Sequence, residues 1–135
     1  MQAASISCIS RPQTTRSAAG LFRSLTCVDV AATGLPSGAY DLVTMCLADE
    51  HLATLPPVYA EAARLARDGG AFVLVGYHPH FIMISGMPTH FTNADGEDIA
   101  IDTHVHLISD HVSAGIEAGW TLAEMREQVI DDEWV

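Results

Sequence analysis

Two nearly continuous apolar runs, with a helical stripe between them, dominate the pattern of hydrophobic positions. Residues 40–47 read YDLVTMCL and residues 71–77 read AFVLVGY, which is typical of parallel strands covered on both faces. Between the two runs, apolar positions recur at spacings of three and four, which predicts a helix with one buried face. These positions are Leu55, Val58, Ala62 and Leu65.

The ends of these segments also carry signals. Pro56 and Pro57 suit the start of the helix, and Asp68-Gly69-Gly70 is a typical helix stop. Strand, helix and strand together predict a βαβ unit. A shorter apolar run at 25–28 enters Asp29 and predicts another strand, followed by the turn-rich loop AATGLPSG.

The pattern changes after Tyr77. Residues 78–108 contain Pro, Gly and Asn breakers and no sustained helical period, which predicts a loop or lid. Within this stretch, residues 100–108 alternate as an exposed edge strand or hairpin arm does. Ser109 or Asp110 is expected to cap a helix that stops at Gly119.

Two short elements are expected after that helix. The spacing of Thr121 and Glu124 matches a capping box and predicts one further helical turn. The segment MREQVI, residues 125–130, then reads as a last strand.

Composition narrows the classes of function. The chain has 135 residues, enough for one domain, and a formal net charge of −11. Such acidity argues against nonspecific nucleic-acid binding, which needs a basic face. No apolar run approaches the roughly 20 residues that cross a bilayer, so no membrane partner is expected. The three cysteines form no CxxC pair, which fits a cytoplasmic protein; Cys27 and Cys46 are predicted to be small core residues.

The order of these features resembles a class I S-adenosylmethionine-dependent methyltransferase with a type 11-like methyltransferase domain. The resemblance rests on Asp29 after a strand, the Leu35-Pro36 turn, the YDLV strand, and Gly69-Gly70 before the next strand. It implies an α/β fold with a Rossmann-like, mostly parallel sheet. The family pattern also has a glycine-rich loop and a second acidic residue, and neither occurs before Asp29.

The resemblance therefore implies a truncated domain, in which the first two βα units and the final strand are missing. Residues 1–24 would be a residual helix or irregular leader. Residues 25–135 would be a partial methyltransferase domain, with a lid-like insertion at about 78–108.

The resemblance also implies site residues. Asp29, with Val30 beside it, would bind the adenine of S-adenosyl-L-methionine, although such an Asp can also simply cap its own backbone. Leu47 would contact the cofactor at the end of the fourth strand of the family. Asp49, Glu50 and His51 would lie near the methyl group and position a substrate or remove its proton. Alternatively, the two acids favour the positive end of a helix.

His78, which follows the next strand, is a candidate contact for the methyl acceptor, with His80 and His90 as weaker candidates. The implied reaction is methyl transfer to a small-molecule acceptor. Aligning the acceptor with the methyl group is its main requirement, and such positioning can supply roughly 7–11 kcal/mol.

Two other classes of function remain open. A methyltransferase-like subunit without catalytic activity could bind a protein partner through an open sheet edge. A metal-dependent hydrolase is also conceivable, because His78 and His80 form one HxH motif and His104 and His106 form another. The spacing to Asp110-His111 departs from the HxHxDH motif of metallo-hydrolases, which favours the methyltransferase.

Overall fold

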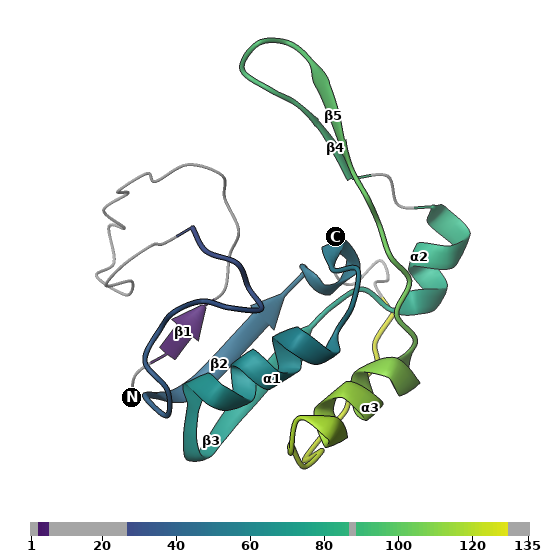
Figure 1. Cartoon of the computed structure of the whole chain (residues 1–135). Helices are drawn as coiled ribbons and strands as arrows, with labels where there is room; N and C mark the ends of the chain where they lie inside the picture. The colour runs from purple at the N-terminus through teal and green to yellow at the C-terminus, as the bar shows by residue number, and fades with distance from the viewer. Residues whose placement is uncertain (1–2, 6–26, 87–88, 130–135) are drawn as a thin grey trace.

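The computed structural model of the chain describes residues 3–5, 27–86 and 89–129 (Figure 1). The elements in chain order are β1 (Ala3–Ser5), β2 (Tyr40–Cys46), the 3-10 turn η1 (Asp49–His51), α1 (Pro56–Leu65), β3 (Ala66–Val75), α2 (Pro79–Ser85), β4 (Thr89–Thr92), β5 (Asp98–Ile101) and α3 (Ile108–Glu117).

The central sheet has three strands in the order β1-β2-β3, and both pairings are parallel. Val43 of β2 is paired with Phe72 of β3, and Cys46 with Val75. The prediction of two parallel neighbouring strands from the two apolar runs is therefore confirmed. The carboxyl ends of β2 and β3 consequently lie at the same edge of the sheet.

The predictions for the region before β2 are wrong. Residues 3–5, expected to be helical or irregular, form the short strand β1 beside β2, since an Ala-Ala-Ser segment pairs through its backbone and carries no apolar pattern. Of the strand predicted at 25–28, Cys27 and Val28 have no regular structure, and the other two residues lie outside the described part of the chain.

Helix α1 lies along one face of the sheet, with α3 beside it (Figure 1). The four residues of its predicted stripe are all buried. Ala62 and Leu65 pack with Val43 of β2, and Leu55 packs with Tyr59 and Ala114. Burying a side chain of this size contributes about 1.5–3 kcal/mol. The predicted stripe, and the helix that it defines, are confirmed.

The opposite face of the sheet is more exposed than the apolar runs predict. Along β3, Phe72 and Leu74 are half-buried whereas Val73 and Val75 are exposed. This alternation is typical of a sheet with one covered face. The expectation that both faces are covered is therefore wrong for β3. Cys27 and Cys46, predicted to be small core residues, are exposed, so that prediction is wrong.

The turn from α1 into β3 is tighter than the sequence pattern predicts. The helix ends at Leu65, three residues before the predicted Asp-Gly-Gly stop, and β3 starts at once. The register jumps from Tyr40↔Ala66 to Leu42↔Ala71, so residues 67–70 bulge from the ladder. A Cβ at Gly70 would lie 2.9 Å from the Arg67 carbonyl oxygen, which explains a glycine there.

The segment predicted as a loop or lid holds regular structure. It begins with α2 and continues into the antiparallel hairpin β4–β5, which extends away from the sheet (Figure 1). Of the hairpin arm predicted at residues 100–108, only Ala100 and Ile101 lie in a strand, β5 (Asp98–Ile101), and the rest of that prediction is wrong. The expected absence of a helix is wrong at α2. A seven-residue helix is too short to show a clear helical period.

Helix α3 forms near the predicted position, but its N-cap is Leu107, so the prediction that Ser109 or Asp110 caps it is wrong. Asp110 lies in the first turn and accepts a hydrogen bond from the Leu107 backbone N–H at 2.7 Å. Beyond Gly119 the expectations fail. Residues 120–129 have neither the predicted helical turn nor a strand, and their large apolar side chains, such as Leu122 and Met125, are exposed. No helix among the described residues is long and apolar enough to cross a membrane.

Candidate functional site

The backbone is strained where β2 ends. Leu47 has a φ of 49°, and no other residue except glycine has a positive φ in the described ranges. This left-handed conformation costs about 1–2 kcal/mol for an L-residue. The Leu47 N–H donates to the Val75 carbonyl at 2.7 Å, and half of its side chain is exposed. Such strain is often found at functional sites, and the cofactor contact of Leu47 stays a prediction.

Asp49 connects the ends of the two paired strands. Its carboxylate, only 4% exposed, lies directly against Gly76, the residue that follows β3. A Cβ at position 76 would be 2.5 Å from Asp49 Oδ1, so only glycine fits there. Asp49, which follows the end of β2, therefore also contacts the residue that follows β3.

The other carboxylate oxygen of Asp49, Oδ2, faces a histidine that was not predicted to belong to this site. His111 of α3 lies with Nε2 3.4 Å from Asp49 Oδ2. The other ring nitrogen of His111, Nδ1, is 2.9 Å from the Tyr59 hydroxyl of α1. The three residues are far apart in sequence, and the position of His111 depends on how α3 packs against α1.

The pKa of Tyr59 is raised in this environment. Burial, and then the nearby Asp49 carboxylate, raise the pKa of Tyr59 to about 12. The phenol therefore keeps its proton near neutral pH and can donate it to His111 Nδ1.

Glu50 and His51 share the η1 turn with Asp49. Glu50 is 2% exposed, and its Oε1 lies 3.7 Å from His51 Nε2. The segment that follows the β4–β5 hairpin contacts this turn at two points. The Glu50 carbonyl accepts from the His104 N–H at 2.7 Å, and His51 Nδ1 lies 3.3 Å from the Asp102 carbonyl. The structure thus brings together the three predicted residues Asp49, Glu50 and His51.

His78 is placed in a separate contact. It forms the N-cap of α2, and its Nδ1 accepts from the His80 N–H at 3.1 Å. Its Nε2 lies 3.0 Å from Glu127 Oε1, and both side chains are about half exposed. The structure therefore pairs His78 with the end of the described chain, and its role toward an acceptor stays a prediction.

Asp29 is exposed, and its Oδ1 accepts a hydrogen bond from the Ala31 N–H at 2.9 Å. This is the backbone-capping arrangement that the sequence left open as the alternative to adenine binding. Val30 beside it is half-buried. A carboxylate accepts several hydrogen bonds, so the contact with Ala31 leaves Oδ2 for a ligand, and the adenine role of Asp29 and Val30 stays a prediction.

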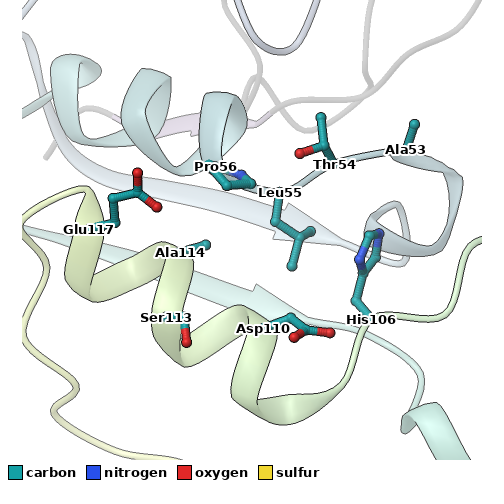
Figure 2. Close-up of a pocket in the computed structure, with 9 residues that line it drawn as sticks. All are labelled: Ala53, Thr54, Leu55, Pro56, His106, Asp110, Ser113, Ala114 and Glu117. Carbon is teal, nitrogen blue, oxygen red and sulfur yellow. The ribbon is translucent and has the colours of Figure 1, made fainter.

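A groove of about 300 Å³ lies between the start of α1 and helix α3 (Figure 2). Its lining includes Leu55 and Ala114 on its apolar side, and His106, Asp110 and Glu117 on its polar side. None of the residues predicted to bind cofactor or acceptor lines it. The groove is therefore a different feature from the strand-end site.

The histidine pairs do not assemble a metal centre within the described ranges. No group of three or more His, Cys, Asp or Glu residues is arranged there to hold a metal ion. His106 instead lies with Nε2 2.7 Å from the Leu52 carbonyl, and the ring of His111 stands edge-on to that of His106. The structure therefore lends no support to the metal-dependent hydrolase.

Comparison with known proteins assigns the chain to a family. Residues 6–74, just over half of the chain, match the family described as "Methyltransferase domain". The chain belongs to this methyltransferase family. The predicted resemblance is therefore confirmed, and Leu47, Asp49 and Tyr59 all lie in the matched part of the methyltransferase domain.

A solved structure supports the fold. The chain is similar to an S-adenosylmethionine dependent methyltransferase from Mesorhizobium loti, with a TM-score of 0.52 and 20% sequence identity. The match covers 70% of this methyltransferase chain and 51% of the solved one, so the chain spans about half of that protein's length. The predicted Rossmann-like α/β fold is confirmed. A comparison with curated proteins gives no match.

Proposed function

We propose that this chain binds S-adenosyl-L-methionine at the carboxyl ends of β2 and β3 and takes part in methyl transfer to a small-molecule acceptor. The observation that carries the proposal is Asp49, buried between the end of β2 and Gly76 after β3. In open α/β sheets, ligands bind outside the carboxyl ends of the strands. Membership of the methyltransferase family supports methyl transfer as the reaction.

The residues present fit such a ligand. Asp29 is exposed and Leu47 is half exposed, so both side chains can reach a ligand, whereas Asp49 Oδ1 and Glu50 Oε2 are buried without a hydrogen-bond partner. In this proposal Asp29 and Val30 contact the adenine, and Leu47 packs beside the rest of the cofactor.

The bound cofactor supplies an electrophilic methyl group on a sulfonium, so the protein has little covalent chemistry to perform. Asp49, Glu50 and His51 would orient the acceptor or accept its proton, and His78 would contact it from α2. The acidic composition, with a net charge of −11, favours a small molecule over a nucleic acid as the acceptor.

Calorimetric titration with S-adenosylhomocysteine tests the proposal. Wild-type protein is expected to bind with a measurable heat, and Asp29→Asn to bind more weakly, since the amide presents a weaker acceptor to the adenine amine. Asp68→Asn at the opposite end of β3 is the matched control and should bind as the wild type does. Absence of binding at millimolar ligand would contradict the proposal.

A second candidate, a partner-binding subunit without catalytic activity, has one observation in its favour. Val73 and Val75 of β3 expose 44% and 51% of their surface on the uncovered face of the sheet. Exposed apolar side chains in one patch often mark an interaction site. The same titration discriminates, because this candidate requires no S-adenosylhomocysteine binding.

A further inference from the structure

The strained turn after β2 needs contacts that hold it in place. A left-handed conformation at a residue other than glycine persists only where the surrounding structure enforces it, and Leu47 has a φ of 49°. The Leu47 N–H donates to the Val75 carbonyl at 2.7 Å. Two residues further on, Asp49 has Oδ1 against Gly76 and Oδ2 3.4 Å from His111 Nε2. Asp49 is therefore a side chain through which the rest of the fold can act on this turn.

Burial of the Asp49 side chain is costly by itself. The residue is 4% exposed, and its Oδ1 has no hydrogen-bond partner among the described residues. A buried polar group whose hydrogen-bonding capacity is not met costs free energy, so stability alone does not account for an acid at this place. The contact with His111 offsets part of that cost and favours one orientation of the carboxylate.

Tyr59 connects His111 to the core. The Tyr59 hydroxyl lies 2.9 Å from His111 Nδ1, and the Tyr59 ring stands edge-on to Phe72 of β3, with 5.2 Å between the ring centroids. The Tyr59 carbonyl accepts a hydrogen bond from Trp120 Nε1 at 3.3 Å. A continuous series of contacts therefore runs from the core through Tyr59 and His111 to Asp49 and the strained turn.

We propose that His111 and Tyr59 are positioning residues, which act through Asp49 to hold residues 47–51 in the conformation that a ligand meets at the ends of β2 and β3. Neither residue is assigned a contact with the ligand. The inference rests on the proposed function for the ligand and goes beyond it, because the held conformation belongs to the free protein. A site of this kind loses affinity when its supporting contacts are removed, even if every ligand contact is kept.

Amide hydrogen exchange in the free protein tests the inference. His111→Leu keeps an apolar bulk and removes both ring nitrogens, so the Leu47 amide should exchange about tenfold faster through local opening of the turn. His111→Gln keeps an amide that can donate to Asp49 and should stay within about threefold of the wild type. The Ala39 amide is the matched control, because it donates to the Leu65 carbonyl at 3.0 Å at the opposite end of β2. Its exchange should be unchanged in both variants.

The affinity for S-adenosylhomocysteine is the second measurement. In calorimetry His111→Leu should bind about fivefold more weakly than the wild type, because an unsupported turn is less often in the binding conformation. His111→Gln should bind as the wild type does. Tyr59→Phe removes only the hydroxyl and should change both measurements in the same direction by about twofold to threefold.

The outcomes separate this inference from the proposed function. Unchanged exchange of the Leu47 amide in both His111→Leu and Tyr59→Phe, or equal acceleration of the Leu47 and Ala39 amides, would overturn the inference while leaving cofactor binding intact. Equal effects of His111→Leu and His111→Gln would also overturn it, because packing alone would then explain them.

Failure of the wild type to bind S-adenosylhomocysteine would contradict the proposed function itself, whereas the exchange measurement would still decide whether His111 and Tyr59 hold the turn. Circular dichroism confirms the folding of each variant. If His111→Leu does not fold, the exchange of the Leu47 and Ala39 amides in Tyr59→Phe decides the question.

Discussion

The Thr33 hydroxyl donates a hydrogen bond to Glu61 Oε1 at 2.6 Å, and the Thr33 N–H donates to the same oxygen at 2.9 Å. This contact ties the loop after Asp29 to α1, which packs on the sheet. Arg64 completes it with two N–H groups at 2.7 Å from the Glu61 carboxylate, and a third donates to Ser37 of the loop. The predicted adenine-binding loop is therefore held by one buried carboxylate.

Thr33→Val should destabilise the fold by about 1–3 kcal/mol, because it removes the hydroxyl donor to a buried acceptor without changing side-chain shape. Chemical denaturation measures the loss. Thr33→Ser restores the hydroxyl and should recover most of the stability. If Thr33→Val and Thr33→Ser were equally stable, the hydroxyl would contribute nothing.

The Glu61 carboxylate predicts a loss of stability in acid. Hydrogen bonds from Arg64, aided by Thr33 and opposed by burial, lower the pKa of Glu61 from 4.5 to about 2. A pKa that is lower in the folded state adds stability that is present above pH 4.5 and is lost as the pH falls through about 2. In Glu61→Gln this part of the acid dependence should disappear, as measured by denaturation across that pH range.

Gly76→Ala should displace the Asp49 carboxylate, because the added Cβ would lie 2.5 Å from Oδ1 and 2.9 Å from Oδ2. The expected cost is about 1–3 kcal/mol in thermal or chemical denaturation, as for other overpacked sites. Gly115→Ala is the matched control, because its Cβ would meet Tyr59 at 3.6 Å, an ordinary contact. That variant should gain up to about 1 kcal/mol in α3. Equal stability of the two variants would argue against close packing at Gly76.

Tyr59 predicts a change in alkaline solution. Its pKa is raised to about 12 by burial and by Asp49, so the folded state holds the phenol proton through a pH range where the unfolded chain releases it. This contribution to stability is complete below pH 10 and is lost as the pH rises through about 12. Ultraviolet absorbance should show one tyrosine that ionises late, and Tyr59→Phe should remove it. A late tyrosine that persists in Tyr59→Phe would contradict the assignment.

Sequence periodicity predicts the parts of this fold that depend on burial. Leu55, Ala62 and Leu65 define α1, and the apolar run around Val43 defines the central strand, because these side chains form the core. Elements without an apolar signal are not predictable in this way. The strand at residues 3–5 depends on backbone pairing alone.

The same distinction applies to the residues of the candidate site. Leu47, Asp49 and Glu50 follow from their place after an apolar strand and from the family resemblance. His111 does not, because its contact with Asp49 arises only when α3 packs against α1 and brings residues 62 positions apart together. The HVHLISDH segment suggests metal binding, whereas the structure uses His106 and His111 as hydrogen-bonding partners.

The most direct test of the central claim is an NMR titration of the isotopically labelled chain with S-adenosylhomocysteine, followed through its amide chemical shifts. The account predicts the largest changes at Val30, at residues 47–51 and at Gly76, where the ends of β2 and β3 meet. Changes confined to the groove beside His106 and Glu117, or no changes at millimolar ligand, would contradict it.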